Sequence, residues 1–255
     1  MNQILVTEKL YITPELKRKK KAYKFYFFLS VFLVCILVSF YIYAEVDRNK
    51  SEEVSQAILD EFNQNIDNSL ADSNVLVAIL NDTEDTSSEN NSTTETPSNT
   101  SSNNNNKFST NKVETTSDGF RYITIGSINI PKINVSYPIL DGETDSVEET
   151  EALLKISPTK FWGVDPNEIG NFSLVGHNYR NSKFFSKVPT LENGDKIEIT
   201  DNTGRTLTYT VFDKYEVVPS DTSCTAPNTN GTRDLTLITC TNDSQLRVIV
   251  KARAN

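Results

Sequence analysis

The pattern of hydrophobic and polar positions divides the chain into parts with different periodicities. Residues 25–44 (FYFFLSVFLVCILVSFYIYA) form a run of twenty uncharged, mostly apolar residues with Tyr and Phe at both ends. As a helix at ~1.5 Å per residue, this run would be about 30 Å long, which matches the apolar layer of a bilayer. Aromatic side chains favour the membrane interface. The pattern therefore predicts a transmembrane anchor over residues 25–44.

The next segment, residues 45–80, carries apolar side chains at every fourth position among acidic and polar residues. These positions are Val54, Ile58, Phe62, Ile66 and Leu70. Such spacing indicates a stalk helix whose apolar stripe drifts around the axis. Two interpretations stay open, namely self-association through the stripe and a solvated, loosely packed helix.

In residues 81–118 the composition changes to Ser, Thr, Asn and acidic residues. Phe108 and Val113 are the only large apolar side chains in this segment. Without a core to bury, the conformational entropy lost on ordering is not repaid. The segment is therefore predicted to be a disordered linker.

Residues 119–255 show the alternation that is typical of β-strands. The candidate strands are RYITIGSINI, VSYPIL, NFSLVGH, DKIEI, RTLTYTVFDKYEVV, LTLITCT and QLRVIVKAR. Turn signals separate them, and the turn at residues 201–204 predicts a hairpin. A short helix is expected over residues 146–156. Seven or eight short strands with few helices predict an all-β fold, a closed or nearly closed β-barrel.

The net charge of −9 hides an asymmetry along the chain. Residues 1–24 hold seven Lys/Arg against two Asp/Glu, whereas residues 45–255 carry a balance of −14. The basic residues before the apolar run should keep residues 1–24 in the cytoplasm and place the rest outside. A cleaved signal peptide is the alternative, but its apolar core is usually about 7 to 15 residues long. The acidic balance disfavours nucleic acid as a partner.

The chemistry available to the chain is narrow, because it has three cysteines and one histidine. These counts exclude a disulfide scaffold and a metal site made of several histidines. His177 follows the apolar strand at residues 172–176. Cys240 ends another apolar strand, and Arg247 begins the next one, so a hairpin would place Cys240 beside Arg247.

A thiol next to a cation can become a thiolate, and a tetrahedral intermediate needs a donor for its oxyanion. Cys240, His177 and Arg247 therefore suffice for acyl transfer. The plainer interpretations are a structural or exposed histidine, a buried cysteine and a surface arginine.

These residues resemble a known family. The stretch Thr236–Leu237–Ile238–Thr239–Cys240 with Arg247 downstream is similar to the TLxTC...R signature of the sortases, and residues 174–177 (LVGH) resemble their LxGH segment. The resemblance covers residues 119–255, which would be the catalytic domain. It implies an eight-stranded sortase β-barrel and cysteine transpeptidation at the cell wall of a Gram-positive bacterium.

By that resemblance, Cys240 would attack the carbonyl between Thr and Gly of an LPxTG-like sorting signal in surface proteins. His177 would act as acid and base, Arg247 would stabilise the oxyanion, and Thr239 would line the substrate groove. The acceptor would be an amine of a peptidoglycan precursor or of a pilin.

The subclass follows less directly. Class B sortases resemble longer chains with an added helix before the active-site strand, whereas residues 218–234 show no helical period. Classes A, D and E stay possible, with class D preferred. Cys224, in the same loop, is interpreted as an incidental or redox-sensitive thiol.

No cofactor is expected to be required. Four acidic residues could contribute to a calcium site of the kind found in some class A sortases, but a solvated helix face is the preferred interpretation. They are Glu143, Glu148, Glu149 and Glu151.

Three other functions compete with transpeptidation. An extracellular cysteine peptidase would use the same three residues with water as the acceptor. A membrane-anchored, non-enzymatic β-domain would need none of them. An L,D-transpeptidase is disfavoured because its SxGCxR-type motif is absent.

Overall fold

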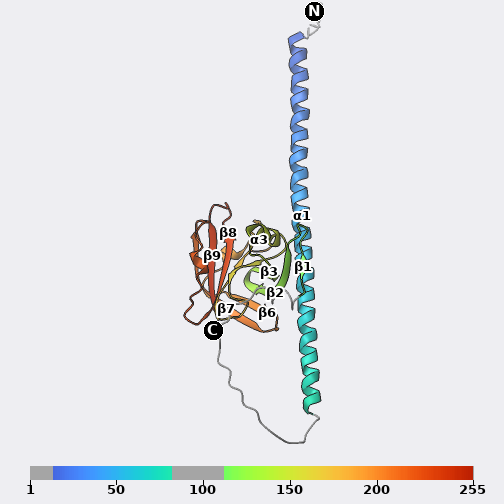
Figure 1. The fold of residues 1–255 in the computed structure, drawn as a ribbon. Coiled ribbons are helices and arrows are strands. Elements are labelled where there is room, and N and C mark those ends of the chain that lie inside the picture. The colour runs from blue at the N-terminus through green and yellow to red at the C-terminus, as the bar shows by residue number, and fades with distance from the viewer. Residues whose placement is uncertain (1–13, 82–111, 255) are drawn as a thin grey trace, which may run out of the picture. The chain divides into compact units, whose positions relative to one another are not determined.

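The computed structural model describes residues 14–81 and 112–254. The predictions for residues 1–13 and for residues 82–111 of the linker lie outside this described part. By its internal contacts the chain divides into two compact units, residues 1–50 and residues 51–255, which are described in turn. Figure 1 shows their elements, and the predicted domain boundaries themselves stay predictions.

The first unit contains the start of a long helix, α1 (Pro14–Asn81). Apolar side chains of this part, such as Phe28 and Leu37, are exposed. In the described part of the chain, α1 is the one helix that is long and apolar enough to cross a membrane. Its length and composition agree with the apolar run in the sequence.

The second unit begins with residues 51–81 of α1, and residues 55–62 pack on the β-domain through one face. The buried positions are Ser55, Ile58, Leu59 and Phe62, whereas Val54 of the predicted stripe is exposed. This spacing of three and four follows the period of 3.6 residues, which a strict spacing of four does not. Ile58 packs in a cluster with Tyr122, Leu140 and Leu153. Over residues 51–68 the apolar face of the helix meets the domain of the same chain, which neither a solvated nor a self-associating stalk predicts.

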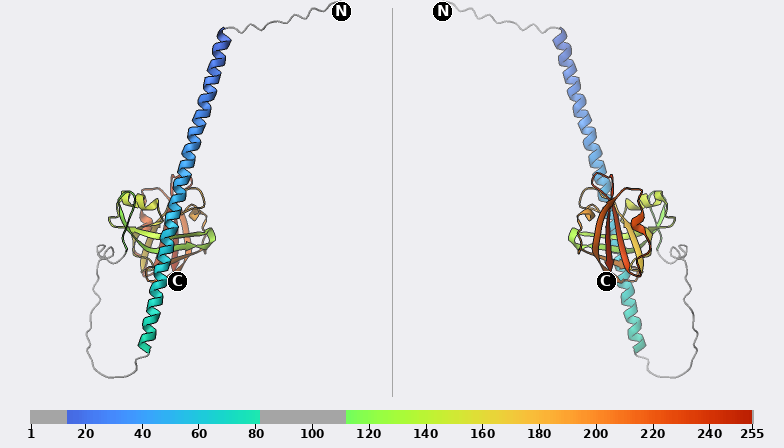
Figure 2. Two further views of the ribbon diagram at one scale, coloured as in Figure 1. Left: turned by 90° about the vertical axis from the view of Figure 1, so that its right-hand side faces the viewer. Right: turned by 90° about the vertical axis from the view of Figure 1, so that its left-hand side faces the viewer.

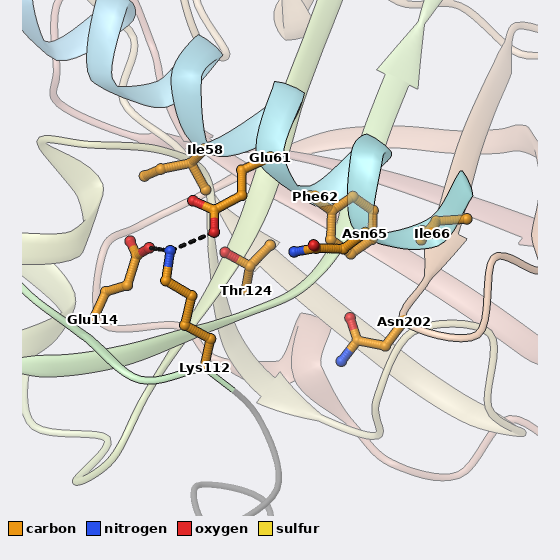
Figure 3. A pocket seen from close by; sticks show the side chains of 9 residues that line it. All are labelled: Ile58, Glu61, Phe62, Asn65, Ile66, Lys112, Glu114, Thr124 and Asn202. Atoms are coloured by element: carbon orange, nitrogen blue, oxygen red, sulfur yellow. Dashed lines mark hydrogen bonds and ion pairs between the residues drawn. The ribbon is translucent and has the colours of Figure 1, made fainter. Parts of the chain in front are cut away.

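Polar contacts reinforce the packing of α1 on the β-domain. The Ser55 hydroxyl donates to the Ser157 hydroxyl at 3.0 Å. Lys112 lies between Glu61 and Glu114 and pairs with both (Figure 3). These charged groups rim a pocket of about 200 Å³ between α1 and the domain.

In residues 112–254 the structure contains nine strands, one α-helix and three short 3₁₀ turns. The strands are β1 (Glu114–Thr115), β2 (Arg121–Ile130), β3 (Val135–Gly142), β4 (Thr159–Gly163), β5 (Gly170–Val175), β6 (Lys196–Asp201), β7 (Thr206–Val217), β8 (Arg233–Cys240) and β9 (Arg247–Ala254). The helical pieces are α3 (Val147–Leu154) and the turns η1 (Pro131–Ile133), η2 (Val188–Thr190) and η3 (Ser223–Thr225). The Ser146 hydroxyl caps α3 by accepting from the Glu149 N–H, which explains where the helix begins.

The strands form one sheet in the order β1-β2-β3-β4-β5-β8-β9-β7-β6, and β6 pairs back with β2. Strands β2 to β9 thus close into an eight-stranded barrel, as predicted, and the curving strands are visible in Figure 2. Closure needs a glycine at Gly126, since an added Cβ would lie 2.5 Å from the Thr200 carbonyl oxygen. The core inside the barrel is made of apolar residues, among them Ile128, Phe172 and Leu237.

Two details differ from the sequence analysis, and a third agrees with it. The strand β4 was not predicted, and its Phe161 and Trp162 are exposed. Residues 112–118 were assigned to the linker, yet β1 pairs with β2 there, because Val113 packs against the barrel core. The predicted hairpin at residues 201–204 does join β6 and β7.

Candidate active site

His177 lies just beyond β5, in a segment that is fixed by close packing. We call residues 176–185 the histidine segment. An added Cβ on the preceding Gly176 would meet the ring of the fully buried Phe185 at 2.5 Å, so only glycine fits. The Phe185 N–H donates to the His177 carbonyl oxygen at 3.1 Å. The backbone on both sides of the histidine is therefore held in place.

Cys240 and Arg247 face each other across the hairpin of β8 and β9. They are register partners at the end of the antiparallel ladder. Leu237 belongs to the core inside the barrel, whereas Ile238 belongs to a separate cluster on the other face. Because side chains alternate along a strand, Cys240 shares the outer face with Ile238. Both Cys240 and Arg247 are partly exposed.

His177 meets this pair because β5 and β8 are parallel. Val175 and Ile238 are register partners, and His177 and Cys240 each come two residues later. The Gly176 N–H donates to the Ile238 carbonyl oxygen at 3.1 Å. The structure thus brings the three residues predicted from the sequence to one edge of the barrel.

Thr239 joins the two strand ends, and the prediction that it lines a substrate groove does not fit its placement. Its side chain is 1% exposed. Its hydroxyl donates to the Gly176 carbonyl oxygen at 2.8 Å. Its side chain points to the face of β8 opposite to that of Cys240. It thereby links β8 to the histidine segment.

Asn178 is a site residue that the sequence analysis missed. Its side-chain amide donates to the Cys240 carbonyl oxygen at 2.8 Å and to Asn242 at 3.1 Å. It therefore connects the histidine segment to the loop after the cysteine. Its place next to the only histidine was the available signal, but an Asn in a loop is too common to stand out.

The surroundings of His177 favour its neutral form. Burial of the imidazole is the main cause that lowers the pKa of His177 below its usual 6.5. The nearby cations Arg247 and Lys155 lower that pKa as well, while Glu151 of α3 acts against them and raises it. A neutral imidazole can accept a proton from a thiol.

The other two cysteines, Cys35 and Cys224, lie in different surroundings from those of Cys240. Cys35 belongs to the first unit and is exposed, whereas Cys224 is buried against Ile238 and Ile249 in the second unit. Burial is the main cause that raises the pKa of the Cys224 thiol. No cysteine in the described residues forms a disulfide. Cys224, which lies within η3, is thus a packed thiol with little access for a reagent.

The loop that carries Cys224 is fastened by buried polar contacts. The carbonyl oxygen of Cys224 accepts hydrogen bonds from Asn171 at 3.0 Å and from Lys251 at 2.8 Å. Lys251 also donates to the Thr236 hydroxyl. This network holds η3 over the outer face of β5, β8 and β9, which explains why both faces of β5 are buried.

The acidic residues considered for calcium have other partners. Glu149 is buried and accepts hydrogen bonds from the backbone N–H groups of Glu143 and Thr144. Glu143 pairs with Arg121 at 2.8 Å. Among the described residues, no group of three or more His, Cys, Asp or Glu side chains is arranged to hold a metal ion. That no cofactor is required stays a prediction.

The comparison with protein families agrees with the geometry. The sortase domain matches residues 128–255 of the chain. The chain belongs to the sortase family. That match covers the barrel from within β2 to the end and includes His177, Cys240 and Arg247.

Solved structures similar to this sortase come from several classes. The chain is 32% identical to a sortase D5 transpeptidase of Clostridium perfringens, over 52% of this chain and 79% of that one, with a TM-score of 0.45. It is 28% identical to a lid mutant of sortase A from Corynebacterium diphtheriae (52% and 71% covered, TM-score 0.43). It is 24% identical to Clostridium perfringens sortase C, solved with the C-terminal cell wall sorting motif (52% and 70% covered, TM-score 0.44). No curated protein matches the chain.

The three structures belong to classes D, A and C, and their TM-scores lie below 0.5. They therefore do not decide the subclass, and the preference for class D stays a prediction.

Proposed function

We propose that this sortase is a membrane-anchored cysteine transpeptidase that cleaves an LPxTG-like sorting signal and joins the acyl product to an amine. One observation carries the proposal. His177 and Cys240 each lie two residues beyond the register pair of the parallel strands β5 and β8, and Cys240 faces Arg247 across the hairpin. A nucleophile, a proton acceptor and a fixed cation thus meet at one edge of the barrel.

The first half of the reaction forms a thioester. The Cys240 thiol gives its proton to the neutral imidazole of His177, and its sulfur bonds to the carbonyl carbon between Thr and Gly of the signal. Arg247 stabilises the negative charge that develops on the carbonyl oxygen. When the C–N bond breaks, His177 returns the proton to the leaving Gly amine.

The second half of the reaction consumes the thioester. An incoming amine attacks the same carbonyl carbon, and His177 takes the proton that this nitrogen loses. The C–S bond then breaks, and the Cys240 sulfur recovers a proton from His177. The product is a new amide, and the thiol and the neutral imidazole are restored.

The location proposed for the enzyme follows from α1 and the charge of the chain. The apolar run 25–44 would cross the membrane with the basic residues before it in the cytoplasm. The catalytic domain would then lie outside the cell, where surface proteins bearing sorting signals and the amines of the cell wall or of pilins are found. A cleaved signal sequence is the alternative, and a size measurement of the mature protein would distinguish the two because cleavage shortens the chain.

For the subclass we keep class D. The connection between β7 and β8 contains only the three-residue turn η3 and no α-helix, which supports exclusion of class B. The lack of an α-helix in this connection does not distinguish class D from classes A and E.

The test is a product analysis with the full chain. A peptide containing an LPxTG-like signal is mixed with an amino acceptor, and the products are separated by mass. A transpeptidase yields the ligated peptide, and the yield rises with acceptor concentration. Hydrolysis alone, at every acceptor concentration, would mean a cysteine peptidase, and no cleavage by a folded enzyme of any tested signal would favour a non-enzymatic domain.

A further inference from the structure

Contacts between α1 and the barrel converge on the segment that follows His177. The Glu52 carboxylate of α1 pairs with Lys183 Nζ at 2.6 Å, and the Lys183 side chain is only 14% exposed. Glu52 also lines one pocket with Tyr137 of β3, whose pKa is raised first by burial and also by this carboxylate. One carboxylate on the helix therefore lies against both a barrel strand and the histidine segment.

Tyr137 in turn contacts Phe184 through both its hydroxyl and its ring. The Tyr137 hydroxyl accepts a hydrogen bond from the Phe184 N–H at 3.2 Å. The two rings are stacked, with centroids 5.0 Å apart and planes 3° from parallel. Phe184 is fully buried and has a φ of 49°, a left-handed conformation that a bulky residue adopts only where its surroundings hold it.

Phe184 in turn packs on the neighbour of the histidine. Its ring meets Tyr179 edge-on, with centroids 5.5 Å apart. The Tyr179 ring lies 5.1 Å from the imidazole of His177. Aromatic contacts of this kind have preferred geometries. They therefore fix the orientation of the rings relative to one another, in addition to burying them.

We propose that Glu52 is a positioning residue for His177. Through Tyr137, Phe184 and Tyr179 it fixes the segment after β5, so the helix α1 completes the active site from outside the barrel. The inference rests on the proposed function for its kinetic consequence, since it assigns His177 to the reaction. It also implies that the barrel alone, without residues 51–66, would be a poorer enzyme than the full chain.

The electrostatic surroundings of His177 make the effect measurable. The charged groups that act on the imidazole are Glu151 and Lys155, in and just after α3, and Arg247 of β9. Glu52 is not among them. Removing Glu52 should therefore act by loosening the segment and admitting water, which moves the pKa of His177 up toward 6.5, because burial is what lowers it.

The experiment compares Glu52→Ala with Glu53→Ala in the full chain, purified in detergent. Glu53 is the exposed neighbour on the same helix, so it serves as the matched control. Since His177 is the only histidine in the chain, its titration is followed by NMR with labelled histidine and without a substrate. Peptide ligation gives kcat and KM.

Glu52→Ala should lower kcat by about tenfold with little change in KM, the pattern expected when a reacting group is misplaced. It should also raise the pKa of His177. Glu53→Ala should change neither. Tyr137→Phe, which keeps the ring stack and loses the hydroxyl, should shift both readouts in the same direction as Glu52→Ala. Thermal unfolding shows that each variant is folded, and Tyr137→Phe decides the matter if Glu52→Ala does not fold.

The proposal is overturned if Glu52→Ala and Tyr137→Phe both keep the wild-type kcat and histidine titration, or if Glu53→Ala changes them equally. A wild-type chain that fails to ligate any peptide would count against the proposed function. The substrate-free titration would still test the positioning role, so the two failures are distinguishable.

Discussion

The protonation of His177 sets the balance between its roles as acid and base. Burial, Arg247 and Lys155 lower its pKa, and Glu151 raises it. We therefore expect the single histidine to titrate below 6.5, so that it is less protonated at pH 6.5 than an ordinary histidine. Arg247→Met removes a cation and should raise this pKa, whereas Glu151→Gln removes an anion and should lower it further. NMR titration of the three proteins would contradict the account if either variant shifted the pKa in the other direction.

The guanidinium of Arg247 is expected to act through its shape as well as its charge. Arg247→Lys keeps the charge but loses the planar fork of donors. If Arg247 stabilises the oxyanion, kcat for peptide ligation should fall about 10²- to 10³-fold, as when one oxyanion donor is lost. Arg253→Lys, on the same strand and paired with Asp234, is the control and should keep kcat. A wild-type kcat for Arg247→Lys would remove Arg247 from this role.

At the scale of elements, the junction between β5 and the histidine segment depends on Gly176. Its replacement by Ala would press a Cβ against the buried Phe185 ring. Gly176→Ala should lower the free energy of unfolding by about 1–3 kcal/mol, as overpacking does, and should also reduce kcat because His177 moves. Denaturant unfolding and ligation assays measure the two effects.

Gly194→Ala provides the comparison for that variant. Gly194 has a φ of 97° and nothing within 4 Å of an added Cβ, so its replacement strains the backbone away from the site. It should lower stability and leave kcat unchanged. Equal losses of kcat in both variants would mean that destabilisation alone explains Gly176→Ala.

The elements also show what the sequence could predict. Alternation and turn residues were enough for most strands, and a short loop between two strands was enough to pair Cys240 with Arg247. The parallel pairing of β5 with β8, which brings His177 to Cys240, comes from contacts distant in sequence and has no local signal. In the same way, the role of Thr239 depended on which face of β8 points inward.

The packing of α1 escaped prediction for a related reason. The apolar positions indicated a helix, but the face that is buried depends on the partner surface, here around Tyr122 and Leu153. Glu52 looked like one more acidic residue on a solvated helix. Only the structure places it against Lys183 and Tyr137.

For the whole molecule, the proposed topology gives a direct prediction. With the basic residues before the apolar run held in the cytoplasm, a reporter fused after Asn255 should be accessible from outside intact cells. A reporter fused before Met1 should be accessible only after the cells are opened. Surface labelling of the two fusions checks this, and a protected reporter after Asn255 would contradict the proposed anchor.

The most direct measurement of the central claim is the site of the acyl intermediate. The full chain is mixed with an LPxTG-like peptide without acceptor, stopped with acid, digested and analysed by mass spectrometry. The three cysteines, Cys35, Cys224 and Cys240, lie in separate parts of the sequence, so the modified one is identified directly. The account predicts an acyl group on Cys240 alone, and none in Cys240→Ala. An acyl group on Cys224, or ligated product from Cys240→Ala, would contradict it.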